Sequence, residues 1–467
     1  MDLIGLYPTW YEPGIGSGWM VGLIATIHVL FSHTSVGAAL FFMALATIAY
    51  RQNRPELLDF IKKYGLFLLV FSYILGSITG PGIWYSTTVA SPRGISSLIH
   101  SFVWKWATEW VFFVIEVVGV YLVTYLVGKV DQKTHLRLTI ILGLASYTTM
   151  MIILGILSFM MWPGKEEWFT EGGYLLGFYG DNTFAQLAMR TAFMFAVTAV
   201  VGSIVTSGFK DQAFRAQMNR WLAIMGIVST IIGAALFGWY LETLPEYAHL
   251  IMENRLPAWF APSLYSILGG MLVYFVLMIT TPRMITTAVA SLATVAILVF
   301  GLWPEEVARE SIRKPYVSGQ YVYSNQVIAR DVPGMGIKSE IPVLEEHGWL
   351  KTHAFMPEEL RVVTPQNAAK VGEALAVTMC SNCHSLSETG IRPMKNYLGG
   401  NTDIPAIKTY LLAALATGNT MYMPKIPMKD EEAEALAVYL ATLTDKTVAQ
   451  RYAAEKGAVA QAVSVEE

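Results

Sequence analysis

Eight apolar segments constrain this chain more than any other feature of its sequence. Each segment is long enough to cross about 30 Å of hydrocarbon as a helix that rises about 1.5 Å per residue. The predicted spans cover residues 19–48, 65–89, 100–127, 137–161, 184–207, 219–243, 262–281 and 284–303. Only Thr281-Pro282-Arg283 separates the last two segments. One broken helix is therefore the alternative at that point.

The composition agrees with a membrane protein that carries a second, soluble region. Of the 467 residues, 54% are hydrophobic and only 14% are charged, unlike the balance of a soluble globular chain. The net charge of −3 gives no polybasic signature, so nucleic acid is not an expected partner. The apolar runs occupy residues 1–303, behind an acidic, aromatic leader that does not resemble a cleavable signal peptide.

The charges of the connecting loops predict the orientation of the chain. The odd-numbered loops are basic and contain Arg51, Lys62, Lys133, Lys210 and Arg283 among their residues. The even-numbered loops are mainly acidic, from Glu166 to Glu253. Because cationic loops stay in the cytoplasm, both ends of the chain are expected on the outer side of a bacterial cytoplasmic membrane.

A second decisive feature is Cys380-Ser381-Asn382-Cys383-His384, which holds both cysteines of the chain. C-x-x-C-H is the attachment site of a c-type haem, in which the thiols form thioethers and the histidine binds iron. A redox dithiol does not need the histidine, and a zinc site needs two further ligands nearby. Haem attachment takes place on the outer side of energy-conserving membranes, in agreement with the loop charges.

The region after the eighth span is predicted to contain three parts. Residues 304–365 are rich in proline and read as an extended connector on the outer surface, with a short hairpin at Gln320–Ile328. Residues 366–445 form a small helical domain, with helices at Ala368–Thr378, Ile404–Ala416 and Asp430–Leu443. Residues 446–467 read as a flexible tail.

This small domain resembles a class I cytochrome c, because one helix runs into C-x-x-C-H and an amphipathic helix closes the domain. About forty residues after the motif stands Thr420-Met421-Tyr422-Met423-Pro424. The resemblance implies Met423 as the second axial ligand of the iron, with Met421 as the alternative. Thioether ligation raises the potential of a haem and suits it to electron transfer.

Ionisable residues at membrane depth are costly and usually functional. They are His28 and His33 in the first span, His100, Glu109 and Glu116 in the third, and Arg190 in the fifth. His28 is a candidate ligand of a b-type haem, and the alternative is a histidine hydrogen-bonded between helices. His33 is equally a candidate haem ligand or a histidine hydrogen-bonded between helices. His100 is a candidate haem ligand or a residue at the membrane interface.

Glu109 and Glu116 are seven residues apart and therefore share one face of the third helix. A carboxylate pair at this depth predicts a proton route or a haem site. Arg190 is expected to pair with a haem propionate or with a glutamate.

Residues 19–127 resemble the first three helices of the large subunit of cytochrome bd oxidase. The matching stretches are Thr26-Ile27-His28-Val29-Leu30-Phe31, Thr79-Gly80-Pro81-Gly82, and Glu109-Trp110-Val111-Phe112-Phe113 followed by Glu116. The resemblance implies that His28 binds the high-spin haem at which oxygen is reduced. It also implies that both glutamates lie beside that haem, on the proton route.

The chain departs from this family at three points. The fifth span offers Met189-Arg190-Thr191-Ala192 and no histidine for the low-spin haem of the family. Residues 244–261 are too short for its quinol-binding loop and lack the motif G-R-Q-P-W. The family has nine spans, against eight here, and the eighth span here is followed by the haem motif.

These features predict an all-α protein with a transmembrane bundle of about eight spans and a small soluble α-helical cytochrome c domain. The expected function is a membrane-bound respiratory cytochrome that moves electrons between a buried haem b near His28 and an outer haem c. Quinone, a c-type cytochrome, membrane lipid and further respiratory subunits are the expected partners. The alternatives are a terminal oxidase fed through the haem c, and a non-catalytic anchor of a larger complex.

Overall fold

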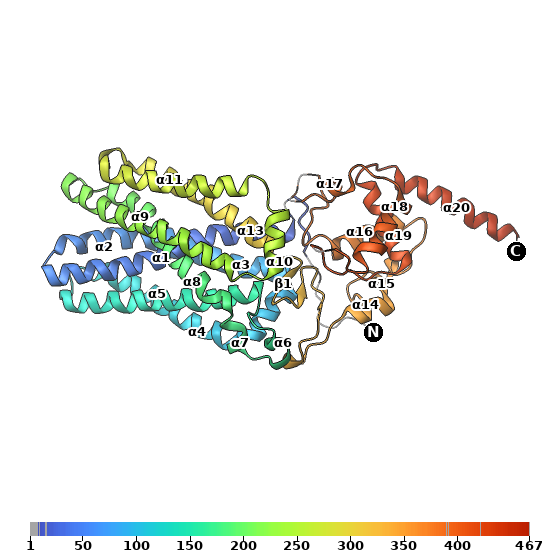
Figure 1. The fold of residues 1–467 in the computed structure, drawn as a ribbon, viewed down its shortest axis with the longest axis horizontal. Helices are drawn as coiled ribbons and strands as arrows, with labels where there is room; N and C mark the ends of the chain where they lie inside the picture. Colours follow the sequence, from blue (N-terminus) through green and yellow to red (C-terminus); the bar gives the residue numbers. More distant parts are fainter. Residues whose placement is uncertain are drawn as a thin grey trace.

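The computed structural model describes residues 8, 10–14, 16–388, 390, 392–420 and 422–466. Within these residues, eight helices are long and apolar enough to cross a membrane, which confirms the predicted number. They lie side by side in an elongated bundle, and a smaller helical body follows at one end (Figure 1). The all-α fold class is therefore confirmed, and the described residues add only one two-stranded sheet.

Six of the eight spans are continuous helices apart from a kink at Phe102 in α4. They are α1 (Ser17–Gln52), α4 (Pro92–Tyr125), α5 (Gln132–Met161), α8 (Asp181–Ser207), α9 (Gln212–Glu242) and α11 (Phe260–Thr280). The second span joins α2 (Pro55–Leu68), the π-helix η1 (Leu69–Ile74) and α3 (Leu75–Ala90). The eighth joins α12 (Thr287–Ile297), the π-helix η3 (Leu298–Leu302) and α13 (Trp303–Arg313).

The connections are short, and several carry helices of their own. The 3-10 helix η2 (Pro282–Met284) separates α11 from α12, so the seventh and eighth spans are distinct. Helices α6 (Glu167–Glu171), α7 (Tyr174–Phe178) and α10 (Glu246–Arg255) lie at the end of the bundle that faces the smaller body (Figure 1). This is the end that holds the acidic loops.

Two aspartates show why helices begin at the opposite end. Asp131 caps α5, since its carboxylate accepts a hydrogen bond from the backbone N–H of Thr134 at 3.0 Å. Asp211 caps α9 and accepts from the N–H groups of Ala213 and Phe214. Each carboxylate satisfies backbone donors that have no partner within the helix.

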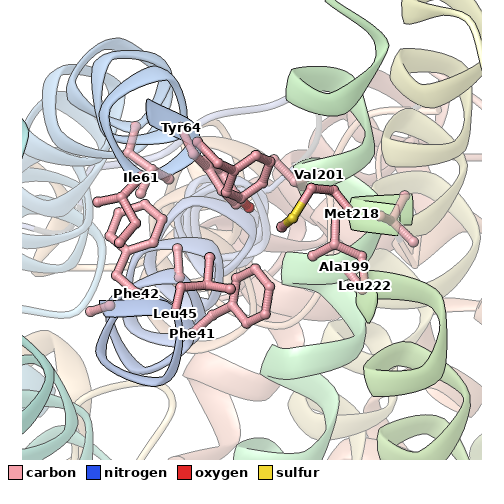
Figure 2. Close-up of a cluster of buried hydrophobic side chains, with 14 of the residues drawn as sticks. Phe41, Phe42, Leu45, Ile61, Tyr64, Ala199, Val201, Met218 and Leu222 are labelled. Carbon is pink, nitrogen blue, oxygen red and sulfur yellow. The ribbon is translucent and has the colours of Figure 1, made fainter. Parts of the chain in front are cut away.

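The core of the bundle lies where α1, α2, α8 and α9 meet. Figure 2 shows Phe42 of α1 beside Tyr64 of α2, with Met218 and Leu222 of α9 approaching from the other side. The rings of Phe42 and Tyr64 are 5.4 Å apart in an edge-to-face arrangement. The hydroxyl of Tyr64 donates to the backbone carbonyl of Thr198 at 3.0 Å, so this buried polar group is satisfied.

Glycines allow the helices to approach one another closely. A Cβ atom at Gly37 of α1 would lie 2.2 Å from the hydroxyl of Thr198 in α8. A Cβ atom at Gly226 of α9 would lie 2.3 Å from the ring of Phe275 in α11. Small residues at crossings are how membrane helices gain packing when lipid is as apolar as the side chains.

The predicted extended connector over 304–365 is corrected in most of its length. Its first ten residues continue the eighth span as α13, because paired charges allow a helix to persist where hydropathy falls. Strands β1 (Tyr316–Ser318) and β2 (Val322–Tyr323) form an antiparallel hairpin. This hairpin begins four residues before the predicted one, and Val322 also pairs with Ile328 in an antiparallel bridge, so the predicted turn at Gln320–Ile328 is present as well.

The second half of the predicted connector packs into the smaller body. After η4 (Pro333–Met335) come α14 (Ile341–His347), α15 (Trp349–Thr352) and η5 (Glu358–Leu360). Trp349 is 1% exposed and shares a core with Leu375 and Leu436. Its indole N–H donates to the carbonyl of Pro427 at 2.7 Å. The compact unit therefore begins before residue 366.

The predicted helices of the smaller body are present. They are α16 (Ala368–Met379), α18 (Ile404–Tyr410) with the π-helix η6 (Leu411–Leu415), and α19 (Asp430–Thr442). The short helix α17 (Met394–Leu398) was not predicted. The predicted tail over 446–467 is helical, because Val448–Glu466 forms the helix α20, and its flexibility stays a prediction. Val448 is buried, and the hydroxyl of Tyr452 donates to Glu434, so the start of α20 is tied to α19.

We expect Gly226→Ala to lower the free energy of unfolding by about 1–3 kcal/mol, the usual cost of overpacking a filled core. The added methyl would meet the buried Phe275 ring. Gly238→Ala in the same helix is the matched control, because nothing lies within 4 Å of its Cβ position. Unfolding of both variants in detergent, followed by circular dichroism, measures the difference. Equal stabilities would contradict the close α9–α11 crossing.

Candidate functional site

The C-x-x-C-H stretch follows directly on α16. Helix α16 ends at Met379, and the backbone then turns so that the N–H of His384 donates to the carbonyl of Cys380 at 2.9 Å. The N–H of Cys383 donates to the same carbonyl at 3.0 Å. This tight turn brings the two thiols and the imidazole to one side of the chain.

A cavity of about 480 Å³ lies against this turn. Cys380, Cys383 and His384 line it, and Met423 lines it as well. The remaining wall is largely apolar, with Leu411, Leu415, Ile426, Leu436 and Leu440 among its residues. A cavity of this size and lining is typical of small-molecule and cofactor sites, which span about 300–1,000 Å³. The alternative ligand Met421 lies outside the described residues.

The geometry of His384 suits an iron ligand. Its Nδ1 lies 3.1 Å from the carbonyl oxygen of Arg392, and a carbonyl only accepts, so Nδ1 carries the hydrogen. In the neutral ring the lone pair is then on Nε2, as metal-binding histidines require. Burial lowers the pKa of His384 to about 4, so the ring is neutral at pH 7.

Both thiols are free, as attachment of a haem through thioethers requires. Burial raises the pKa of the Cys380 thiol to about 12. Thiols, a neutral imidazole and a thioether therefore face one cavity with a largely apolar wall, and these residues fit a covalent haem. The described residues contain no cluster of three or more His, Cys, Asp or Glu side chains that could hold a bare metal ion.

His28 lies half-buried in α1 against the glycine-rich α3. Its Nδ1 is 3.0 Å from the hydroxyl of Thr79, and its ring would contact a Cβ atom at Gly80 at 3.5 Å. The hydroxyl of Thr79 donates to the carbonyl of Leu75 at 3.0 Å, so it accepts from Nδ1–H of a neutral His28. The other ring nitrogen, Nε2, is then the one with a lone pair for a metal.

Glu116 is 3% exposed and lies deep in the bundle. It accepts a hydrogen bond of 2.9 Å from the hydroxyl of Tyr73, which belongs to the π-helix η1. π-Helical turns often occur at functional sites, where they re-aim a side chain. Glu109 is half-buried on the same helix, among exposed side chains such as Trp110.

The remaining predicted residues lie in different surroundings. His33 is buried in α1, with 8% exposure. His100 is exposed and lines a second cavity of about 630 Å³, formed with Trp10 at the junction of α3 and α4. Neither of the two cavities includes His28, His33, Glu109 or Glu116.

Arg190 pairs with a glutamate, one of the two predicted partners. Its guanidinium lies 2.6 Å from the carboxylate of Glu305, at the start of α13. Two further ion pairs follow along this helix, namely Glu306 with Arg309 at 2.5 Å, and Glu310 with Arg313. The sequence prediction missed this buried charged helix. Its signal is the spacing of opposite charges at i, i+3 and i+4, which is the spacing of neighbours on a helix.

The chain shares its fold with a bd oxidase. The structure of bd oxidase from Geobacillus thermodenitrificans superimposes with a TM-score of 0.54 and 14% sequence identity. The match covers 66% of this chain and 92% of that chain. No protein-family model and no curated protein matches the sequence. The likeness shows the bd-type helical fold that residues 19–127 were expected to have.

We expect Tyr73→Phe to destabilise the bundle by about 1–3 kcal/mol, because the buried Glu116 carboxyl loses a hydrogen-bond donor. Tyr85→Phe on the same span is the control, since Tyr85 is 73% exposed. Thermal unfolding in detergent compares the two variants. A Tyr73→Phe protein as stable as Tyr85→Phe would show that the bond contributes nothing to folding.

Proposed function

We propose that this chain is a membrane-bound cytochrome that carries electrons between its transmembrane part and one covalent haem c. The observation that carries the proposal is the cavity in which Cys380, Cys383, His384 and Met423 converge. These residues come from segments about forty positions apart, and their chemistry matches two thioethers and two axial ligands. The haem, when bound, supplies a one-electron redox centre at this end of the bundle.

The residues proposed for the haem c have separate roles. The thiols of Cys380 and Cys383 anchor the porphyrin. His384 offers Nε2 to the iron, and its hydrogen bond to the carbonyl of Arg392 fixes the plane of the ring. Met423 offers a thioether from the opposite segment and stabilises the reduced state. The apolar wall excludes water from the centre.

The membrane end of the electron path is proposed to be a haem b held by His28. Two observations support this: the Thr79 bond leaves Nε2 of His28 free, and the fold is that of a membrane oxidase. His28 lies against Thr79 and Gly80, two consecutive residues of α3. The quinone pool is the proposed redox partner within the membrane.

The proposed location is the bacterial cytoplasmic membrane, with the haem c domain, residues 366–445, on its outer side. The smaller body lies at the end of the bundle that bears the acidic loops, and basic loops mark the other end (Figure 1). A soluble c-type cytochrome or further respiratory subunits are the proposed partners there.

A terminal oxidase fed through the haem c is the second candidate, and the buried pair of Glu116 and Tyr73 favours it. Oxygen reduction consumes protons inside the membrane, and a carboxyl group hydrogen-bonded to a phenol can take up and pass on protons. Glu109, two turns away on α4, would extend that route. Binding of carbon monoxide to the reduced protein distinguishes this candidate, because it requires an open coordination position.

We expect the purified protein to contain haem c and haem b in a pyridine haemochrome assay. His28→Ala should remove most of the haem b and leave the haem c, since the proposed ligand sets are separate. Thr79→Val retains the shape of the residue and should weaken haem b binding less than His28→Ala. Haem c without haem b in the unmodified protein would favour the anchor function, and no haem c would refute the proposal.

We expect Met423→Ala to lower the midpoint potential of the haem c, because the thioether stabilises the reduced iron. Axial ligands change haem potentials over a range of about 0.8 V. The shift should therefore exceed about 59 mV, a tenfold change in the ratio of reduced to oxidised haem. Met394→Ala is the control, since Met394 lines the same cavity but stands outside the Met-Pro pair. An equal effect of both variants would reject Met423 as the ligand.

A further inference from the structure

The cavity beside the cysteines is not formed by the smaller body alone. Ile251 and Arg255 of α10 reach it, and so do Ser311 and Lys314 at the end of the eighth span. These residues precede the C-x-x-C-H motif by more than sixty positions. The bundle therefore supplies one wall of the site.

The charge of this cavity is unbalanced. Arg255, Lys314 and Arg392 line it, and no aspartate or glutamate is found among its described lining residues. Lys314 lies 3.4 Å from the carboxylate of Glu310, but that carboxylate also pairs with Arg313. Lys314 and Arg392 are partly buried, whereas Arg255 is exposed. Anions stabilise cations that are withdrawn from water, so a ligand with negative charge would complement this wall.

Arg392 contacts both His384 and the bundle. Its carbonyl accepts from His384, and its guanidinium donates to the hydroxyl of Ser311 at 2.7 Å. The guanidinium also lies over the ring of Trp19 in α1, 5.4 Å from its centroid. Arg392 thus fastens the histidine to two helices of the bundle, and it acts as a positioning residue.

Arg255 has a different environment. Its guanidinium lies over the ring of Tyr422, 4.1 Å from the centroid, next to Met423 in the chain. Among the described residues, Arg255 takes part in no ion pair. It therefore offers its hydrogen-bond donors to a ligand in the cavity. Lys314 offers an ammonium group on the same wall.

We propose that Arg255 and Lys314 of the membrane-spanning part bind the propionate groups of the haem c. This inference rests on the proposed function, because it takes the occupant of the cavity to be haem. A haem carries two carboxylates on one edge, and two cations on one wall match that edge in charge and number. The propionate edge then faces the bundle, and the bundle is part of the haem c site.

The test measures the midpoint potential of the haem c in the full-length protein. In Arg255→Gln a propionate loses its counter-charge, and the uncompensated carboxylate favours oxidised iron. We expect the ratio of reduced to oxidised haem at a fixed potential to fall about tenfold, which equals 59 mV for one electron. Lys314→Gln should shift the potential in the same direction.

Two further variants make the result specific. Arg255→Lys keeps the charge and should restore most of the potential. Arg451→Gln is the matched control, because Arg451 is a well-exposed residue paired with Asp445 at 2.6 Å, outside the cavity. It should leave the potential unchanged. If Lys314→Gln does not fold, the comparison of Arg255→Gln with Arg255→Lys still tests whether the charge at residue 255 sets the potential.

An unchanged potential in Arg255→Gln, with a full content of haem c, would overturn this inference and leave the proposed function standing. Absence of haem c from the unmodified protein would instead overturn the proposed function itself. A fall in potential that Arg255→Lys does not restore would also count against a role for the charge.

Discussion

Helix α13 bears ion pairs along the stretch that extends from the apolar bundle to the cavity beside the cysteines. Glu305 pairs with Arg190 of α8. Two further pairs, Glu306 with Arg309 and Glu310 with Arg313, lie within α13. Glu306 and Arg313 are 3% and 4% exposed. Removal of Arg309, which pairs with Glu306, or of Glu310, which pairs with Arg313, would therefore leave a buried charge unpaired. The helix can therefore continue past the apolar bundle and deliver Ser311 and Lys314 to the cavity. A second link is the ion pair of Arg93 with Glu340, at 2.5 Å.

Much of the bundle could be predicted because lipid imposes a simple rule on sequence. A spanning helix must be apolar over about 20 residues, and local composition reveals it without knowledge of its neighbours. The same rule explains the error at residue 303. Hydropathy falls at Trp303-Pro304-Glu305-Glu306, although the helix continues, because the charges are neutralised by contacts that only the fold creates.

The C-x-x-C-H residues could be named in advance as a candidate haem site, whereas the shape of the cavity beside them could not. C-x-x-C-H can be recognised from five consecutive residues, without knowledge of the fold. That Met423 faces the same cavity followed from a family resemblance. The approach of Arg255, from a loop between the sixth and seventh spans, depends on how the two bodies pack. Sequence spacing contains no signal for such a contact. Trp349 was assigned to the connector for the same reason.

The resemblance to a bd oxidase concerns the arrangement of the helices and not the residues that would bind cofactors. At 14% identity the two chains share an arrangement of helices, while the fifth span here has no histidine. In this chain, close glycine crossings such as Gly37 against Thr198 hold the helices together. A scaffold of this kind can exchange its cofactor sites, because helix packing and ligand choice involve different residues.

Glu432 shows which residues the outer region needs in order to fold as one unit. Its carboxylate is 1% exposed and accepts from the backbone N–H groups of Leu350 at 2.8 Å and Lys429 at 2.9 Å. A segment that started at residue 366 would lack Leu350 and leave half of this carboxylate buried without a donor. Residues 366–445 are thus not a self-contained unit, because α14 and α15 complete the surroundings of Glu432.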